Sequence, residues 1–172
     1  ENEIFHMQAS FTREFEGPSY QDTAPEVAEP ESCPNRDELR GRDKKDAPID
    51  VRMVTPITES EALPPEQHIW LKPTDNLPEN SNLHLALLIY ASDRTLLDTA
   101  WRPHAHLGEH TGASLDHAVW VHNSTDFNKW HLYTMHSPAS GSGRGLAFGG
   151  IHDETGKRII STAQEGVMRL KG

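Results

Sequence analysis

The pattern of hydrophobic and polar residues predicts an antiparallel sheet that occupies most of the second half of the chain. Runs of alternating or β-rich residues, separated by turn sequences or bounded by prolines, fit six strands: 49–57, 67–72, 113–122, 130–137, 145–152 and 158–168. Between the last two runs, the turn DETGK carries Gly156 where positive φ is tolerated, which predicts a hairpin. The glycine-rich stretch 141–145 lacks the spacing of a phosphate loop, so we interpret it as a bend in a strongly curved sheet.

One segment predicts a helix. Residues 83–90 are apolar on almost every side, which is typical of a buried helix, and Asn82 precedes them as a suitable N-cap. We expect the helix to continue or restart at 92–93 and to end before the Arg-Pro pair at 102–103, followed by a Gly/His-rich loop over 103–112. One buried helix within a curved antiparallel sheet is an α+β arrangement of the hotdog type.

The first quarter of the chain has a different pattern. Residues 4–11 alternate between apolar and polar, which predicts a half-buried strand, yet no partner strand follows it directly. Residues 18–48 are rich in proline and charge, so we interpret them as a linker with a short helix at 36–40. The isolated strand therefore predicts pairing partners outside the principal domain, which we place at 49–172.

Composition narrows the classes of function. At 172 residues the chain is long enough for one domain with a real core, and its formal net charge of -10 argues against nucleic acid or a membrane surface as the main partner. A single cysteine, Cys33, rules out an internal disulfide framework and fits a reducing compartment. No run approaches the ~18 apolar residues of a membrane span, and no secretory signal pattern opens the sequence. We expect an intracellular protein.

Asp93 is the most suggestive candidate for chemistry. It lies on a face of the predicted apolar helix, where a carboxylate costs several kcal/mol unless it is hydrogen-bonded or paired. One interpretation is a general base or an anchor for a water nucleophile. The other is that Ser92 and Asp93 form the N-cap of a second helical segment. The residues alone favour neither.

Other polar side chains lie in the predicted strands. In 113–122, Ser114 and Asp116 share a face, whereas Asp116 and His117 point to opposite faces and cannot orient each other. Ser114 has no nucleophile-elbow motif, so a serine that positions water or a carbonyl is the better interpretation. Gln164 is an amide in a strand of otherwise small and apolar residues, and one interpretation is that it satisfies backbone groups at a sheet edge. The histidines of the 103–112 loop have no Cys or Glu at ligand spacing, which disfavours a metal site at its three histidines, His104, His106 and His110.

Several motifs, in order along the chain, resemble the C-terminal half of the TesB-like (type II) acyl-CoA thioesterases: YASD, ASLDH, SPASGSGRGLAFG and AQEGVMR. The opening MQASF and the following GPSYQDTAPEVAEPE look like the last strand of that family's first hotdog domain and its interdomain linker. The resemblance implies one hotdog of a double-hotdog family: 1–17 as the closing strand of a first domain that is otherwise absent, 18–48 as linker, and 49–172 as the C-terminal hotdog. We therefore expect a fragment of a longer polypeptide.

The resemblance also implies an activity and a site. The family hydrolyses acyl-CoA to fatty acid and CoA, and its Asp–Ser/Thr–Gln constellation corresponds to Asp93, Ser114 and Gln164. In the implied mechanism Asp93 is the general base, the other two orient water and the thioester carbonyl, and no cofactor or metal is needed. Candidate contacts for the CoA phosphates, chosen from charge alone, are Arg144, Lys129 and Arg102. The chain departs from the family at 121–125, where Val-His-Asn-Ser-Thr replaces an aromatic-His-Arg-Pro-Phe run.

Two other functions remain open at this stage. A non-catalytic hotdog module for acyl-CoA binding or subunit assembly is the main alternative; a hotdog hydratase is disfavoured because no D-x-x-x-x-H segment opens the helix. Because the family's acyl groove forms between two hotdogs, we expect a homo-oligomer in which a second copy replaces the absent half. The resemblance implies bacterial cytoplasm or the peroxisomal matrix as the compartment.

Overall fold

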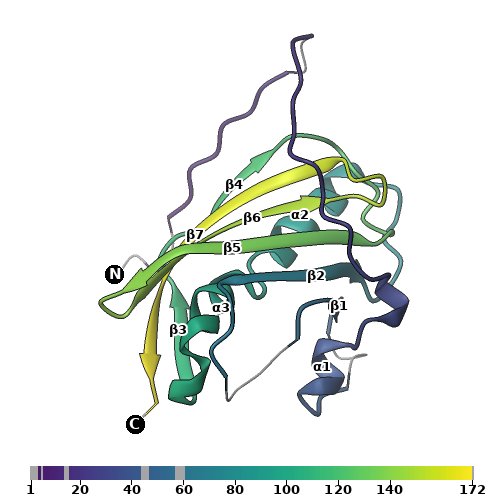
Figure 1. Ribbon diagram of the computed structural model, residues 1–172. Helices are drawn as coiled ribbons and strands as arrows, with labels where there is room; N and C mark the ends of the chain where they lie inside the picture. Colours follow the sequence, from purple (N-terminus) through teal and green to yellow (C-terminus); the bar gives the residue numbers. More distant parts are fainter. Residues whose placement is uncertain (1–3, 5, 14–15, 44–46, 57–60, 172) are drawn as a thin grey trace.

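A curved antiparallel sheet dominates the computed structural model, which describes residues 4, 6–13, 16–43, 47–56 and 61–171 (Figure 1). Its strands are β1 (Ile49–Met53), β2 (Glu66–Pro73), β3 (His110–Ser114), β4 (Ala118–Val121), β5 (His131–Gly141), β6 (Arg144–His152) and β7 (Arg158–Leu170). The strand order is β1-β2-β5-β6-β7-β3, and β4 also pairs with β7. Every pairing is antiparallel, as the sequence predicts.

Helical segments complete the fold: η1 (Pro30–Ser32), α1 (Arg36–Leu39), α2 (Ser81–Ser92), α3 (Leu96–Trp101) and η3 (Arg102–Leu107). In Figure 1 the sheet curves around α2 and α3, which lie on its concave side. The short helix predicted at 36–40 is present as α1. The predicted loop over 103–112 is partly helical, because η3 continues directly from α3, and its last residues already belong to β3.

The β5–β6 connection corrects the interpretation of the glycine-rich stretch. Ser142 and Gly143 both have positive φ, 51° and 71°, and Gly141 pairs directly with Arg144. Two central residues with φ > 0 are the signature of a tight hairpin turn, which glycine adopts without steric cost. The stretch therefore ends one strand and begins the next, and the irregularity in this strand pair is a register shift between His136 and Ala139.

The predicted strand 113–122 is in fact two strands, and the break has a local cause. The backbone N–H groups of Leu115 and Asp116 both point at the Glu165 carbonyl, and Asp116 Oδ1 accepts from the Glu165 N–H at 2.8 Å. This side-chain contact replaces a rung of the ladder. The alternation of faces is therefore lost at 115–117, and Asp116 turns back onto β7 instead of sharing a face with Ser114.

Helix α2 begins two residues earlier than predicted. Asn80, not Asn82, is the N-cap: its Oδ1 accepts from the N–H groups of Asn82 and Leu83 at 3.1 and 3.2 Å. Asn80 has extended backbone dihedrals, which let an N-cap side chain reach forward to the free N–H groups of the first turn. Asn82 lies inside that turn and provides one of those N–H groups.

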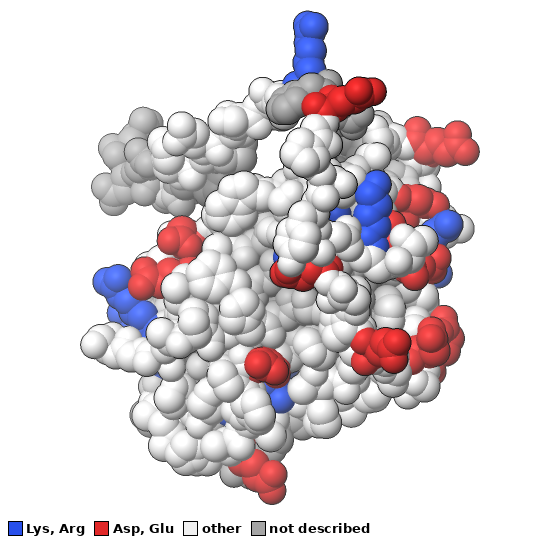
Figure 2. Space-filling view, turned by 45° about the horizontal axis from the view of Figure 1, so that its top comes forward, with Lys and Arg blue, Asp and Glu red and all other residues white. Residues whose placement is uncertain are grey.

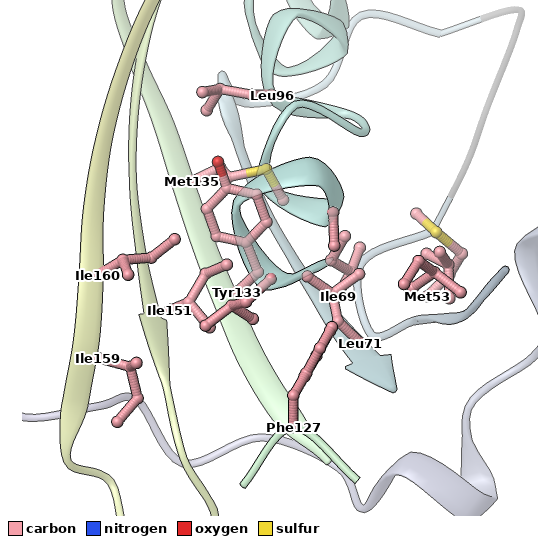
Figure 3. Close-up of a cluster of buried hydrophobic side chains, with 14 of the residues drawn as sticks. Met53, Ile69, Leu71, Leu96, Phe127, Tyr133, Met135, Ile151, Ile159 and Ile160 are labelled. Carbon is pink, nitrogen blue, oxygen red and sulfur yellow. The ribbon is translucent and has the colours of Figure 1, made fainter. Parts of the chain in front are cut away.

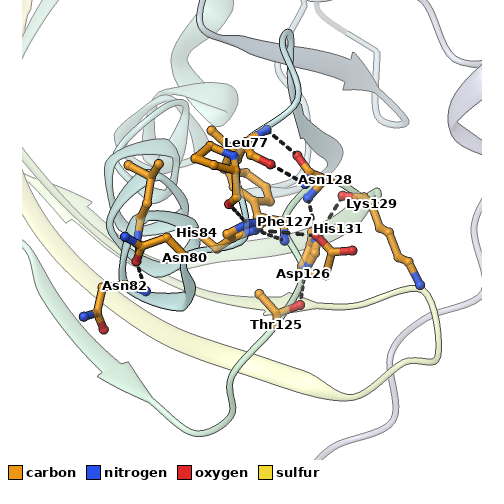
Figure 4. A network of polar contacts seen from close by, with 12 residues as sticks. Leu77, Asn80, Asn82, His84, Thr125, Asp126, Phe127, Asn128, Lys129 and His131 are labelled. Atoms are coloured by element: carbon orange, nitrogen blue, oxygen red, sulfur yellow. Dashed lines mark hydrogen bonds and ion pairs between the residues drawn. The ribbon is translucent and has the colours of Figure 1, made fainter.

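A polar network fixes the start of α2 against the β4–β5 loop (Figure 4). His84 Nδ1 accepts from the Phe127 N–H at 2.9 Å, so its proton is on Nε2, which donates to the Pro78 carbonyl at 3.0 Å. The Asn128 side chain bonds both the N–H and the carbonyl of Leu77, at 2.7 and 3.1 Å. Each buried polar group thus has a partner, and α2 is held in one position relative to the sheet.

The hydrophobic core lies between the sheet and one side of α2 (Figure 3). Leu88 and Ala91 of α2 join a cluster of fully buried side chains from five strands, among them Tyr133. The opposite side of α2 is open: Leu83 is 40% exposed and Tyr90 53%. The prediction of an all-round buried helix is therefore wrong for this chain, because the single sheet covers only one of the helix's two apolar faces.

The N-terminal segment pairs with no strand in the part of the chain that the structure describes. Residues 4 and 6–11 have no strand assignment, and Phe11 is 95% exposed. Phe5, which the prediction placed on the apolar face, lies outside the described residues. A β-strand requires a neighbour for its backbone groups, so the predicted strand is absent here; its assignment to another domain stays a prediction.

The predicted linker lies on the sheet. Gln21 bonds the carbonyl of Gly156 and the N–H of Arg158 at 2.8 and 3.0 Å, and the Trp70 indole donates to the Ala28 carbonyl at 2.9 Å. Cys33 is buried, and the Met53 N–H donates to the Pro34 carbonyl. The described residues of this range, 18–43 and 47–48, therefore contribute to the surface of the folded unit, including the segment that carries α1.

Candidate active site

Asp93 occupies the turn between α2 and α3. It is the C-cap of α2, and Thr95, with a φ of 75°, is the N-cap of α3. The interpretation of Ser92 and Asp93 as the N-cap of the second helical segment is therefore wrong. A carboxylate at a helix C-terminus opposes the helix dipole by about 0.3–1 kcal/mol, so other groups must stabilise Asp93 at this position.

Those groups are Ser114 and Gln164, the two other residues of the predicted constellation. Gln164 Nε2 donates to Asp93 Oδ1 at 2.5 Å and to Ser114 Oγ at 2.9 Å. Ser114 Oγ donates to the same Asp93 oxygen at 3.3 Å. Residues from the end of α2, from β3 and from β7 thus meet as a triangle of mutual hydrogen bonds. The register of the β3–β7 pairing brings Ser114 near Gln164, because Ser114 lies opposite Gly166 on β7.

The three side chains differ in their access to solvent. Gln164 is only 1% exposed, whereas Asp93 and Ser114 are open to solvent. Because a carboxylate only accepts, the Gln164 amide must direct Nε2 toward Asp93, which leaves Oε1 facing away. Gln164 Oε1 is buried and has no hydrogen-bond partner among the described residues. An unsatisfied buried acceptor of this kind fits a water molecule that donates to it.

A second layer of contacts fixes the backbone that carries Asp93. The Tyr133 hydroxyl donates to the Ser92 carbonyl at 2.8 Å and pairs with Thr162 Oγ1 at 2.9 Å. Burial raises the pKa of Tyr133 well above its ordinary value, so the hydroxyl keeps its proton and remains a donor. Ser92 Oγ donates to the Ile89 carbonyl at 2.7 Å. These bonds hold the residue directly before Asp93.

His117 is a neighbour of the triangle that the sequence pattern did not identify. Its Nε2 lies 2.9 Å from Ser92 Oγ, and because the Ser92 hydroxyl already donates to Ile89, His117 must be the donor. Burial lowers the pKa of His117, and the nearby Asp93 opposes that shift only in part. The imidazole is thus neutral at physiological pH. The break at 115–117 aims it at α2, a direction that strand alternation could not predict.

The three basic residues proposed as phosphate contacts do not gather at this site. Arg144 pairs with Glu165 at 3.4 Å, and Lys129 is exposed in the β4–β5 loop. Arg102 is buried and donates to the carbonyls of Pro64 and Pro56, both at 3.1 Å. Its role in the fold is therefore to anchor the chain between β1 and β2.

Two of the three histidines considered as metal ligands make other contacts, and His106 is exposed. His104 Nε2 lies 2.7 Å from Ser140 Oγ, and His110 stacks on Trp101 with ring centroids 4.1 Å apart. Among the described residues there is no group of three or more His, Cys, Asp or Glu side chains that could hold a metal ion. Within the same ranges, no helix combines the length and the apolar character needed to cross a bilayer.

Comparisons with known proteins bear on this geometry. The family profile described as Acyl-CoA thioesterase matches residues 40–167. Acyl-CoA thioesterase 2 of Haemophilus influenzae is 32% identical over 187 residues, covering 98% of this chain and 65% of that protein. Acyl-coenzyme A thioesterase 8 of the mouse is 31% identical, covering 98% of this chain and 60% of that protein. The chain therefore spans about 60–65% of the length of these relatives.

Solved structures agree in fold. The acyl-CoA thioesterase II TesB2 of Mycobacterium marinum superposes with a TM-score of 0.73 at 32% identity, over 91% of this chain and 59% of that one. A hot dog fold protein from Alicyclobacillus acidocaldarius superposes with a TM-score of 0.69 at 15% identity, which confirms the predicted hotdog fold. Profile, relatives and structures converge, and the chain belongs to the TesB-like acyl-CoA thioesterase family.

Proposed function

We propose that this chain carries a hydrolytic site for acyl-CoA in which water held by Asp93, Ser114 and Gln164 attacks the thioester carbonyl. The water oxygen forms a bond to the carbonyl carbon, and Asp93 accepts the proton released. The carbon–sulfur bond then breaks, and the CoA thiolate leaves and takes up a proton, giving free fatty acid and CoA. The reaction needs no further reactant.

The observation that carries this proposal is the triangle itself. Asp93 and Gln164 are 71 residues apart in sequence, yet their side chains are joined directly and both contact Ser114 Oγ. Gln164 Oε1 remains a buried acceptor with no partner among the described residues. A water that donates a hydrogen bond to the solvent-exposed Asp93 is placed for deprotonation, and alignment of this kind lowers a barrier by several kcal/mol.

A covalent serine mechanism is a poorer fit to the same contacts. A nucleophilic serine needs a base such as histidine within hydrogen-bond reach. His117 instead donates to Ser92 Oγ, and Ser114 Oγ is bonded to a carboxylate and an amide. Ser114 is therefore assigned the orientation of water or of the thioester carbonyl.

The test combines thiol release with intact mass. We expect the chain to release CoA from a fatty acyl-CoA and to carry no acyl adduct when the reaction is quenched. Ser114→Ala should retain a measurable rate, reduced about 10- to 100-fold, because Asp93 and Gln164 still hold the water. An acyl group trapped on Ser114, or complete loss of activity in a folded Ser114→Ala variant, would refute the water mechanism.

A second function, a non-catalytic acyl-CoA-binding or assembly module, is favoured by one observation. The open face of α2 presents Leu83, Ala86 and Tyr90 at helical spacing, and Asp93 follows one turn later. The surface next to the triangle is thus apolar, and no described residue covers it, as an acyl-binding or assembly surface would require. Retention of acyl-CoA binding with no thiol release would support this function over hydrolysis.

We further infer that a second copy of the chain covers this face. Apolar residues at helical spacing with no cover in the described structure favour burial against another surface. Molecular mass in solution tests the inference: we expect a dimer or higher oligomer, and Tyr90→Lys should shift it toward the monomer. A monomeric wild-type chain at the concentrations used for assay would contradict it.

A further inference from the structure

A second polar site lies apart from the triangle, in a cleft of about 570 Å³ between α1, α3 and the end of β7. Five of the residues that line it are basic: Arg36, Arg40, Arg42, Arg102 and Lys171. Two acidic residues, Asp98 and Glu109, also line it. The excess of positive charge is notable because the chain as a whole carries a formal net charge of -10. On the face drawn in Figure 2, uncharged and acidic side chains cover far more surface than basic ones.

The ion pairs within the cleft do not balance its charges. Arg36 Nη2 and Arg40 Nη2 lie 3.5 and 3.8 Å from the same oxygen of Asp98, so two guanidinium groups share one carboxylate. Lys171 Nζ pairs with Glu109 at 2.7 Å. Arg102 donates to backbone carbonyls that carry no formal charge. An anion that entered the cleft would meet five basic lining residues against two acidic ones, with Asp37 beside Arg36 as a further negative charge.

Arg36 also has an unused donor inside the protein. The residue is only 9% exposed, yet its Nε has no hydrogen-bond partner among the described residues. A buried donor without a partner costs about 1–3 kcal/mol, and more when the group is charged. Burial and the nearby Arg40 lower the pKa of Arg36, and Asp98 and Asp37 oppose that shift only in part.

The chain segment after Asp93 leads from the proposed hydrolytic site to the cleft. Arg94 follows Asp93 directly in sequence, and its Nε is also buried without a partner among the described residues. The positive charge of Arg94 contributes to lowering the pKa of Arg36. The cleft residue Asp98 is five positions after Asp93, which limits their Cα separation to about 18 Å even for extended chain. Thr95, two residues after Asp93, also lines the cleft, so the segment that carries Asp93 leads into it, as a ligand with a reactive end and an anionic end would require.

We propose that this cleft binds the phosphate groups of the CoA moiety, an inference that rests on the proposed hydrolysis of acyl-CoA. Guanidinium groups bind phosphate oxygens through paired, charge-assisted hydrogen bonds, and Arg36, Arg40 and Arg42 offer several such forks on one short segment. The segment 18–48 then has a function beyond connecting domains, because it supplies half of the binding site for the substrate's carrier group.

Calorimetric titration with adenosine 3′,5′-bisphosphate tests the cleft without any thioester. We expect the wild-type chain to bind this nucleotide more tightly than AMP or inorganic phosphate. Arg40→Gln should weaken binding about tenfold or more, since one charge-assisted contact is lost. Arg40 suits the test because its side chain is 38% exposed and its loss spares the core. Arg36→Gln should weaken binding further, provided that its melting curve matches the wild type.

The matched control is Lys157→Gln, an exposed cation in the β6–β7 turn at the opposite end of β7 from Lys171. This variant should bind the nucleotide like the wild type. No detectable binding to the wild-type chain, or an equal loss in Lys157→Gln and Arg40→Gln, would overturn the proposal, because the attraction would then be absent or a property of net charge alone.

Kinetics separate this proposal from the proposed function. Arg40→Gln should raise KM for an acyl-CoA about tenfold and leave hydrolysis of the matching acyl N-acetylcysteamine thioester, which has no phosphates, unchanged. Equal effects on both thioesters would overturn the cleft assignment. Nucleotide binding that depends on Arg40, in a chain that hydrolyses neither thioester, would instead refute the hydrolase and support the cleft.

Discussion

Removing the Tyr133 hydroxyl tests how the fold positions the site. Tyr133→Phe keeps the ring in the core but deletes the donor to the Ser92 carbonyl and the partner of Thr162 Oγ1. Tyr133 is fully buried, so both groups lose their partner where water cannot easily replace it. Each such loss costs about 1–3 kcal/mol, and we expect the free energy of unfolding to fall by about 2 kcal/mol.

Activity should fall through kcat. Ser92 immediately precedes Asp93, so relaxation of the Ser92 carbonyl moves the proposed base, and a shift on the order of 1 Å costs up to about 100-fold in rate. We expect kcat for acyl-CoA to drop about 10- to 100-fold with KM nearly unchanged. Urea unfolding and steady-state thiol release measure the two effects; Tyr20→Phe, at a 91% exposed tyrosine, is the control. A variant with wild-type kcat, or with a raised KM alone, would refute the positioning role.

Three further predictions concern the site and the fold. Gln164→Ala should lower kcat about 100-fold in a thiol-release assay, because the water loses an oriented partner and Asp93 loses its shortest hydrogen bond; an unchanged kcat would argue against the triangle. Gly166→Ala should destabilise the chain by about 1–3 kcal/mol in urea, since the added Cβ would lie 2.4 Å from Leu97 Cδ2 and 3.0 Å from a backbone oxygen; an unaltered unfolding midpoint would contradict this packing. Burial, together with Arg158, lowers the pKa of His152 to about 4, against an ordinary value of 6.5, so the folded state prefers the neutral ring. The stabilisation that the folded state gains from the neutral ring is therefore full above pH 6.5 and is lost as the pH falls toward 4, about 3 kcal/mol in total. His152→Leu should reduce the change in the free energy of unfolding between pH 4 and 7 by that amount. An identical pH profile for variant and wild type would disprove it.

Local signals in the sequence were sufficient for most of the sheet. The turn at Gly156 has a φ of 81°, as its place in DETGK predicts, and it joins β6 to β7. Turn chemistry and period-two alternation act over a few residues, so a single sequence carries them in full. The constellation of Asp93, Ser114 and Gln164 was predicted from resemblance, and spacing alone would not have joined residues from three elements.

The pattern could not predict what covers an apolar surface. Leu83 and Tyr90 are apolar, yet no described segment packs over them, because hydrophobicity reports a preference and not the presence of a neighbour. The same holds at 115–117, where a side-chain contact from Asp116 to β7 interrupts the strand and turns His117 toward Ser92. Such tertiary contacts override local alternation. Of the basic residues in the cleft, only Arg102 was among the predicted phosphate contacts, since α1 and α3 meet only in the folded chain.

The hydrolysis of a fatty acyl-CoA by the wild-type chain and by Asp93→Asn tests the central claim most directly. Asp116→Asn is the matched control, because this nearby carboxylate accepts only from the Glu165 N–H and an amide oxygen can do the same. With the general base removed, kcat should fall about 100- to 10,000-fold while KM changes little, and the control should hydrolyse at the wild-type rate. Equal rates for Asp93→Asn and the wild type, or no thiol release by the wild-type chain, would contradict the account.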